Sequence, residues 1–343
     1  MEYVGLDMHK KFTFGTVMDS KGKIRKQEKF LTDRDSIKKF LEGVKHAKIA
    51  IESSTSAIPW HGFLTDMGHD VHVSHPLKTK LIAESKIKTD KVDSQVLADL
   101  LRSNFLPCSY VPGAEIVKLR NKTRHRVYLG RLKTSLKNRI RSELGKRGID
   151  EPDTSLFTRK GNDFLVSLNI GEINSSLEVL EFVETKIKRS SEELEQVAKQ
   201  HEDVKLLKTI PGVGTYSALL IFSEIADIGR FGNAEKLCCY AGVVPSIHQS
   251  GSVLRSGRTT KQGSAWLRWI LTEVVWVHIN NSPGSNLTKF FKKLAKTKGK
   301  KKAAVATSRK LLHVIYAMLR DRKPFMIKGQ EKSRSAPAAA MTA

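Results

Sequence analysis

The order of apolar runs in the first hundred residues restricts the fold more than any other feature of this 343-residue sequence. Three strand-like runs, around Val4, Phe14 and Gln27, are joined by short turns and predict an antiparallel meander. A helical stretch over residues 35–44 follows, and then AKIAIESST, whose apolar centre is typical of a buried strand. After another helix, HDVHVSHP supplies a further short strand. A meander followed by alternating helices and strands predicts an α/β domain built on one sheet.

Two carboxylates stand where predicted strands end. Asp7 follows the apolar run YVGL, and Glu52 follows KIAI. Aspartate is uncommon in strands, and a buried one needs a partner or a metal. Taken alone, Asp7 could merely cap the turn that leads to the next strand. Because ligands of open α/β sheets collect outside the carboxyl ends of the strands, we expect Asp7 and Glu52 to share one edge.

A helix predicted over residues 88–104 carries two more acids. Asp90 and Asp93 lie three residues apart and therefore on one side of its first turn. Acids at this place can simply complement the helix dipole. Together with Asp7 and Glu52, however, they would repel one another unless hard cations neutralised them, and oxygen ligands suit Mg²⁺ or Mn²⁺. Because paired divalent ions can stabilise a phosphodiester displacement, the four acids predict metal-dependent chemistry on nucleic acid.

The sequence is strongly basic, with a formal net charge of +25 and a pI of about 9.9. That charge favours a polyanionic partner, and nucleic acid is the leading candidate. A membrane surface is the weaker alternative, because the sequence contains no long uncharged apolar run. The first residues lack the basic flank and apolar stretch of a signal peptide. We therefore expect a cytoplasmic protein that binds nucleic acid and no membrane.

The segment over residues 118–147 has basic side chains at almost every turn, and its apolar residues keep helical spacing. It predicts a basic amphipathic helix that contacts a nucleic-acid backbone, and the alternative is a solvated coiled-coil face. A second helix, over residues 175–200, would pair with it within the chain or across a dimer. The basic residues expected to contact nucleic acid are Lys118, Arg120, Lys122, Arg124, Arg126, Arg131, Lys133, Lys137, Arg139 and Arg141.

The stretch IPGVGTYSAL contains a glycine-rich turn before a predicted helix. Free backbone N–H groups at such a helix start attract phosphate, so Gly212 and Gly214 are expected to contact nucleic acid. The stretch resembles half of a helix-hairpin-helix, which grips the backbone without reading bases. An ordinary turn between helices would explain these residues equally well. The lysine run over residues 292–302 is expected to be a non-specific phosphate grip.

These motifs resemble those of a known family. GLDMHK, IESST and KTDKVDSQVLADLL are similar to the surroundings of the DEDD tetrad in the insertion-sequence transposases related to the pilin-gene invertase. Further along, IPGVGTYSALLIFSEI and YAGVVPSIHQSGSVLRSGRTTKQGSAWLRWIL appear in the order of that family's second domain, so the resemblance covers nearly the whole chain. It implies an α/β RuvC-like, ribonuclease-H-type domain over 1–108, a helical coiled-coil linker over 109–205 and a mainly α-helical transposase domain over 206–325. Residues 326–343 are expected to be a disordered tail.

The resemblance also implies a nucleophile, Ser250, which matches the family's serine in a motif ending Ser-Gly. It lies in an expected polar loop over residues 248–258, where a serine is otherwise a solvated turn residue. A serine hydroxyl can attack phosphorus if a base or a metal removes its proton. His248 is the nearest candidate base in the sequence, although the metal cluster could do the same work. The cations expected to hold nucleic acid here are Arg255, Arg258, Lys261 and Arg268.

The implied function is that of a DNA transposase, or recombinase, that joins donor and target DNA through a covalent phosphoserine intermediate. The resemblance implies a structured bridge RNA as a further partner. We expect a dimer or a tetramer in which Ser250 of one chain faces the acidic tetrad of another. The alternatives are a RuvC-like metal-dependent junction nuclease, a site-specific DNA invertase, and a nucleic-acid-binding module in which the carboxylates hold only a structural metal.

Overall fold

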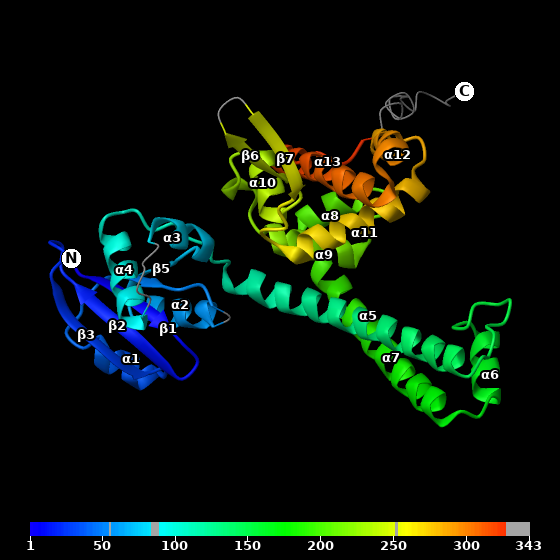
Figure 1. The fold of residues 1–343 in the computed structure, drawn as a ribbon, viewed down its shortest axis with the longest axis horizontal. Coiled ribbons are helices and arrows are strands. Elements are labelled where there is room, and N and C mark those ends of the chain that lie inside the picture. Colours follow the sequence, from blue (N-terminus) through cyan, green and yellow to red (C-terminus); the bar gives the residue numbers. More distant parts are fainter. Residues whose placement is uncertain (55, 84–88, 251–252, 327–343) are drawn as a thin grey trace, which may run out of the picture. The chain divides into compact units, whose positions relative to one another are not determined.

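A computed structural model describes residues 1–54, 56–83, 89–250 and 253–326 of the chain (Figure 1). The chain divides into two compact units, Met1–Pro112 and Gly113–Ala343. The first is an α/β unit and the second is mainly helical, so the expected order of an α/β region and a helical region is confirmed. In the described part of the chain, no helix combines the length and the apolar character that crossing a bilayer would require.

The sheet of the first unit consists, in the described residues, of β1 (Tyr3–Met8), β2 (Phe12–Met18), β3 (Ile24–Leu31), β4 (Lys48–Ile51) and β5 (Asp70–Val73). Their order across the sheet is β3-β2-β1-β4-β5. The pairs β1–β2 and β2–β3 are antiparallel, which confirms the predicted meander. The pairs β1–β4 and β4–β5 are parallel, as strands joined by crossover helices usually are. β1 is therefore the central strand of the sheet.

The helices of the first unit, as far as it is described, are α1 (Arg34–Phe40), α2 (Ala57–Asp66), α3 (Pro76–Ile82) and α4 (Asp90–Arg102). Successive side chains of a strand point to opposite faces of the sheet. Val4 and Leu6 of β1 pack into an apolar core with Ile37 of α1. The alternate residues Gly5 and Asp7 lie on the other face, against which α4 packs. The pleat of one strand thus separates the core from the face that carries a carboxylate.

Helix α1 is shorter than the helix expected over residues 35–44. The Asp33 side chain accepts a hydrogen bond from the Ser36 backbone N–H and fixes the start of the helix. The helix ends at Phe40, and Gly43 has a positive φ of +81°, which a right-handed helix cannot contain. The apolar residues after Phe40 therefore belong to the connection to β4.

The second unit begins with two long helices, α5 (Ala114–Lys146) and α7 (Gly171–Ala198), which lie side by side in Figure 1. Both helices that the sequence predicts in this segment are present. A short helix, α6 (Arg159–Ser167), lies at one end of the pair, where Ile140, Leu165 and Ile173 form a small apolar core. Whether the pair has coiled-coil geometry stays a prediction.

The remaining described elements are α8 (Glu202–Lys208), α9 (Thr215–Ile225), the 3₁₀ helix η1 (Ile228–Arg230), α10 (Ala234–Ala241), β6 (Pro245–Ser250), β7 (Val253–Thr259), α11 (Ala265–Asn281), α12 (Asn286–Lys298) and α13 (Lys300–Asp321). Helix α9 is buried at every residue from Ser217 to Ile225, so it is the central helix of this unit. Leu119 and Val127 of α5 belong to the same apolar core. The first half of α5 is therefore part of the helical bundle.

A β-hairpin occupies the segment where the sequence predicts a polar loop. β6 and β7 pair antiparallel, with Ser250 opposite Val253 and His248 opposite Arg255. Strand pairing uses backbone N–H and C=O groups, so it can occur without the apolar alternation that signals a strand in sequence. Ser250 is the last residue of β6, and residues 251–252, which include the Gly251 of the Ser-Gly motif, lie outside the described residues.

Candidate active site

Asp7 and Glu52 leave the sheet at the same edge. Asp7 lies near the end of β1 and is only 3% exposed. Glu52 follows directly after β4, whose last residue, Ile51, pairs with Leu6 of β1. Because these two strands are parallel neighbours, their carboxyl ends bring the two acids to one place. The arrangement has the form that the sequence predicts.

Helix α4 brings the other two acids to this edge because Gly5 lets it approach β1 closely. A Cβ atom at residue 5 would lie 1.9 Å from the Ser94 carbonyl oxygen and 2.7 Å from the Ala98 nitrogen. The hydroxyls of Thr16 and Ser94 are 2.8 Å apart and hold the helix to the neighbouring strand, β2. Asp90 and Asp93 stand in the first turn of this helix.

A histidine that the sequence prediction missed lies between two of the acids. The Nε2 atom of His9 is 3.2 Å from Asp7 Oδ2 and 3.4 Å from Asp90 Oδ1. The ligand atoms of these three residues all lie within 4.8 Å of one another, so the group could hold a metal ion. The available signal was spacing, because alternate residues at a strand end point the same way and His9 is two residues after Asp7.

The pKa of Asp7 reflects its burial and the charges of the three other acids. Burial is the largest cause of a rise in the Asp7 pKa from 3.8 to about 6. The positive charge of His9 lowers this pKa, whereas the negative charges of Glu52, Asp90 and Asp93 raise it. All three acids therefore lie close enough to act on Asp7. A cation between them would relieve both the burial cost and the repulsion.

A pocket of about 440 Å³ adjoins the acids within the same unit. Glu52 and Asp93 line it, together with Ser74, Lys80 of α3 and apolar side chains of α4. A lysine beside carboxylates offers a positive charge to a phosphate whose other oxygens face a cation. The pocket thus has the polar groups that a phosphodiester next to a metal would need.

Comparison with known proteins identifies the family of the chain. Residues 4–146, which span all four acids, match the DEDD_Tnp_IS110 family (Transposase), and residues 204–290 match the Transposase IS116/IS110/IS902 family. The two matched segments together cover more than half of the chain. The chain belongs to the IS110 family of insertion-sequence transposases.

Curated relatives extend this family assignment over most of the chain. A transposase for insertion sequence element IS1111A from Coxiella burnetii is 27% identical over 286 residues, which is 79% of this chain and 77% of the relative. The pilin gene-inverting protein of Moraxella bovis is 29% identical over 263 residues, or 75% and 74% of the two chains. A transposase for insertion sequence element IS1533 from Leptospira borgpetersenii is 25% identical over 348 residues, or 94% and 96%.

Ser250, the nucleophile expected from the family resemblance, belongs to the second unit. It stands at the tip of the β6–β7 hairpin, where β6 ends. Arg255 and Arg258 of β7 are exposed, so both guanidinium groups are open to a ligand. The backbone of His248 pairs with Arg255, and its role as a base stays a prediction.

Many of the basic side chains of α5 make contacts with other residues of the same chain. Arg126 donates to the Ser191 hydroxyl, and Arg131 stacks over the rings of Trp266 and Trp269. Acidic partners account for further cations: Arg124 with Glu224, Lys133 and Lys137 with Glu184, Arg141 with Glu151, and Lys118 with Glu115. Arg120 donates to backbone carbonyls, whereas Lys122 and Arg139 are exposed. Contact of these ten residues with nucleic acid stays a prediction.

The glycine-rich turn before α9 packs against α11. Gly212 has a φ of +92°, and a Cβ atom there would lie 2.9 Å from the His278 nitrogen. The His278 side chain is 2.8 Å from the Pro211 carbonyl oxygen, which fixes the turn from the other side. Gly214 is the N-cap residue of α9 and supplies no side-chain cap. Gly212 is therefore explained by packing, and phosphate binding at the turn stays a prediction.

Proposed function

We propose that this protein is a metal-dependent transposase that cuts and rejoins DNA strands at the edge of its sheet. One observation carries the proposal: Asp7 is buried at the end of the central strand, and three other acids raise its pKa. Such a cluster is costly for folding unless it is used with a cation. The family membership makes DNA the polymer whose strands are cut.

The first unit is proposed to be a RuvC-like, ribonuclease-H-type domain. Support comes from a sheet in which a three-strand meander continues into two parallel strands, with the first acid on the central strand. The second acid follows the parallel neighbour of that strand, and the last two begin a helix across one face. This arrangement brings all four acids to one end of the sheet.

Mg²⁺ or Mn²⁺ is the proposed cation, because the donors are mainly carboxylate oxygens. Asp7, Glu52, Asp90 and Asp93 are the proposed ligands, and His9 offers a nitrogen at the same place. When bound, one or two such ions would neutralise the carboxylates and stabilise the charge that develops on a phosphodiester. Lys80, on the pocket wall, is placed to orient the phosphate by its charge.

The proposed nucleophile is the Ser250 hydroxyl. Its oxygen attacks phosphorus, its proton passes to a base, and the bond from phosphorus to the leaving sugar oxygen breaks. The product is a phosphodiester between protein and DNA, and the released sugar hydroxyl takes up a proton. Because the ester keeps a bond of the same type, a second DNA strand can displace the serine without an external energy source. Hydrolysis by water would forfeit that possibility.

A further proposal concerns the assembly. The carboxylates belong to the first unit and Ser250 to the second, so the two parts of the chemistry are carried by different folded units. We propose a dimer or a tetramer in which Ser250 of one chain serves the tetrad of another. A composite site of this kind would make strand cutting depend on assembly.

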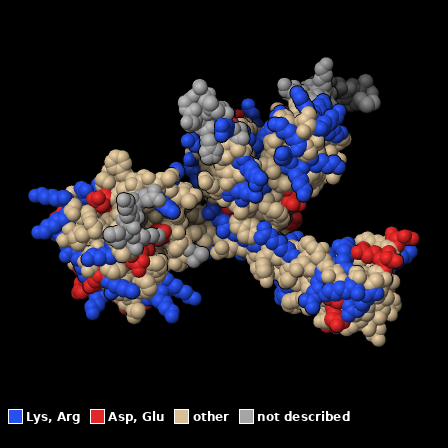
Figure 2. Space-filling model, viewed as in Figure 1, with Lys and Arg blue, Asp and Glu red and all other residues tan. Residues whose placement is uncertain are grey.

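The proposed RNA partner is a structured bridge RNA that pairs with donor and target DNA. Support comes from charge: the chain carries a formal charge of +25, and Figure 2 shows Lys and Arg gathered over α12 and α13. Helix α12 contains five lysines and no acid. Such a surface suits backbone contact with folded RNA, and base pairing would then supply the sequence specificity.

The decisive experiment looks for the protein–DNA ester. The protein is incubated with its RNA, Mg²⁺ and labelled DNA, denatured, and examined for label that migrates with the protein. The wild type is expected to form the adduct, and Ser250→Ala is expected to lose both the adduct and strand cutting. Ser252→Ala, two residues further along the sequence, is the matched control and should keep both.

Two outcomes would overturn the proposal, and each would indicate a different function. Nicked DNA from Ser250→Ala at the normal rate, without an adduct, would indicate a nuclease that activates water. Full DNA binding without strand cutting in the wild type, with and without RNA, would indicate a binding module with a structural metal.

A further inference from the structure

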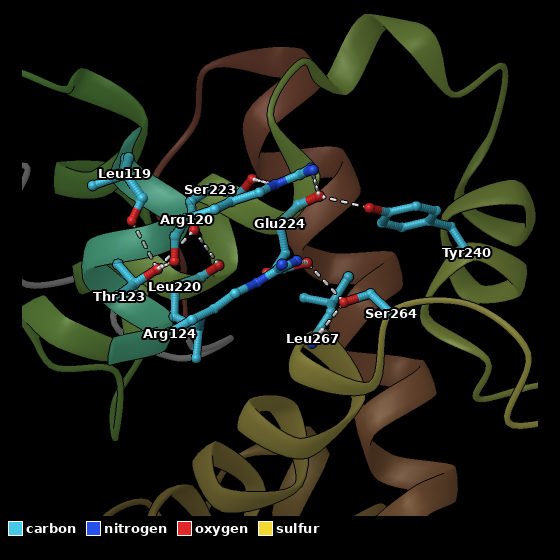
Figure 3. Close-up of polar contacts among 10 residues, drawn as sticks. All are labelled: Leu119, Arg120, Thr123, Arg124, Leu220, Ser223, Glu224, Tyr240, Ser264 and Leu267. Atoms are coloured by element: carbon cyan, nitrogen blue, oxygen red, sulfur yellow. Dashed lines mark hydrogen bonds and ion pairs between the residues drawn. The ribbon is translucent and has the colours of Figure 1, made fainter. Parts of the chain in front are cut away.

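The second unit contains a buried carboxylate that the proposed chemistry does not use. Glu224, near the end of α9, is 1% exposed. Arg124 of α5 pairs with it through two contacts, Nε to Oε1 at 2.8 Å and Nη2 to Oε2 at 3.1 Å (Figure 3). The Ser264 hydroxyl donates to Oε2 at 2.8 Å. An acid in the most buried helix of the unit is thus fully paired, by groups from two other segments.

The backbone at the same point is also held from two sides. The Glu224 carbonyl oxygen accepts hydrogen bonds from Arg120 Nη2 at 3.0 Å and from the Tyr240 hydroxyl at 3.1 Å (Figure 3). Arg120 Nε donates to the Ser223 carbonyl at 2.7 Å. The last carbonyls of a helix lack partners within the helix, and cations there oppose the negative end of its dipole. We call Arg120, Arg124, Glu224, Tyr240 and Ser264 the polar hub.

Two members of the polar hub flank the serine hairpin. Tyr240 precedes β6 by five residues, and Ser264 follows β7 by five residues. The two are joined directly, because the Ser264 N–H donates to the Tyr240 carbonyl at 2.8 Å. Gly263 permits this contact: it has a φ of +109°, and a Cβ atom there would lie 2.0 Å from the Tyr240 oxygen. Both ends of the hairpin segment therefore meet at the hub.

Arg268 of α11 also joins the two ends of the hairpin segment. Its Nη1 atom donates to the Ala241 carbonyl at 3.1 Å and to the Lys261 carbonyl at 3.2 Å. The Thr260 N–H donates to the Val244 carbonyl at 2.9 Å, which joins the strands at the same level. Arg268 and Lys261 were expected from the sequence to bind nucleic acid. In this structure the Arg268 side chain ties the segment before β6 to the segment after β7, and the Lys261 backbone carbonyl is one of its two acceptors.

A second set of contacts links α5 to the same segment. The guanidinium of Arg131 lies 4.8 Å from the ring of Trp266, and that of Arg124 lies 5.7 Å from it. Trp266 is two residues after Ser264, in the first turn of α11. Cation–π contacts and the ion pair therefore connect the same two elements, α5 and α11, by independent interactions.

We propose that Glu224 is a positioning residue for Ser250, acting through Ser264 and Tyr240 on the base of the hairpin. The carboxylate holds the start of α11 against α5, and the flanking contacts pass this position to both strands. A charged pair suits the task because its bidentate geometry permits one arrangement, whereas an apolar contact tolerates sliding. The catalytic consequence rests on the proposed function of Ser250. The mechanical link from the hub to the hairpin does not.

The test measures the hairpin directly, by amide hydrogen exchange in the full chain without nucleic acid. Glu224→Gln should speed exchange over residues 243–264 by about tenfold or more, while exchange in the first unit stays unchanged. Glu143→Gln is the matched control, since Glu143 pairs with Arg147 at the other end of α5 and should leave the hairpin as it is. Exchange at wild-type rates in the hairpin of Glu224→Gln would overturn the proposal.

A second measurement separates positioning from general stability. Adduct formation at saturating DNA should slow by about tenfold to a hundredfold in Glu224→Gln, because a displaced nucleophile reacts more slowly. The Kd for DNA should change by less than about twofold. If this variant does not fold, Ser264→Ala leaves the Arg124–Glu224 pair in place and removes the hydroxyl that donates to Glu224 and caps α11 by accepting from the Leu267 N–H. Ser264→Thr, which keeps a hydroxyl for both contacts, should restore both exchange and rate. Equal effects of the Ala and Thr variants would overturn the proposal. If Ser250→Ala still cuts DNA normally, the proposed function fails, and hairpin exchange still decides the mechanical link.

Discussion

Asp7 and Glu224 are both buried carboxylates, one in each unit, but the charged groups around them differ: mainly negative around Asp7 and positive beside Glu224. Asp7, 3% exposed, faces three other acids and a single histidine, and its pKa is raised to about 6. Glu224, 1% exposed, faces a guanidinium and a hydroxyl that satisfy both of its oxygens. Burial alone therefore does not identify a functional acid. A buried acid among like charges predicts a cation-binding site, whereas a buried acid paired with Arg predicts a structural role.

The largest effect expected from this comparison is on strand cutting. Asp7→Asn should lower the cutting rate by at least about a thousandfold, since bound divalent ions supply several kcal/mol of transition-state stabilisation. The melting temperature of the metal-free protein should stay the same or rise, because the change removes a buried like charge. Asp35→Asn, at an exposed acid in the first turn of α1, is the control for both measurements. A cutting rate in Asp7→Asn within tenfold of wild type would show that the acid is not part of the site.

The converse prediction is a loss of stability at Glu224. Glu224→Ala should lower the free energy of unfolding of the second unit by about 3 to 4 kcal/mol, because Arg124 loses its partner in a mostly buried place. The side chain of Arg124 is 37% exposed, so water keeps the cost near the lower end. Urea unfolding followed by tryptophan fluorescence suits this test, because Trp266, Trp269 and Trp276 all lie in α11. A loss below about 1 kcal/mol would mean that the pair does not hold the unit together.

The smallest predicted effect is on pH dependence. Because the folded-state pKa of Asp7 lies near 6 and its ordinary value is 3.8, the folded protein favours the protonated acid. The contribution of Asp7 to the stability of the metal-free protein should be fully present below about pH 4 and should be lost, by at most about 3 kcal/mol, as the pH rises through 6. Unfolding curves of the wild type and Asp7→Asn in a chelator measure this as a difference between the two proteins. Mg²⁺ should remove the decline in the wild type, and parallel profiles without metal would contradict the pKa.

The acidic edge could be predicted because its determinants are local. Apolar runs of strand length located β1 and β4, and the rule that parallel strands end together brought Asp7 and Glu52 to one edge. His9 was missed although it stands in the same motif, since a histidine after a strand has many ordinary explanations. The signal was its two-residue spacing from Asp7, and it becomes visible only when Asp90 supplies the third group.

The polar hub could not be predicted, because its partners are far apart in sequence. Arg124 and Glu224 are 100 residues apart, and a basic helix gives no sign of which cations point inward. The sequence analysis assigned Arg120 and Arg124 to nucleic-acid contact, which stays a prediction, and gave no sign of their partners within the chain. The hairpin was missed for a related reason: the segment over residues 245–259 lacks the apolar alternation from which strands are read.

The glycine beneath α4 has a consequence for ion size. Gly5 lets the backbone of α4 lie so close to β1 that a methyl group would sit 1.9 Å from the Ser94 oxygen. In Gly5→Ala the helix would have to retreat, and Asp90 and Asp93 would move away from Asp7 with it. A wider set of oxygens suits Ca²⁺, which takes ligands at about 2.3–2.6 Å, better than Mg²⁺, which needs about 2.0–2.1 Å. The absence of one side chain, two residues from the first acid, thus fixes how closely α4 approaches β1, and with it the size of the ion that the proposed site would accept.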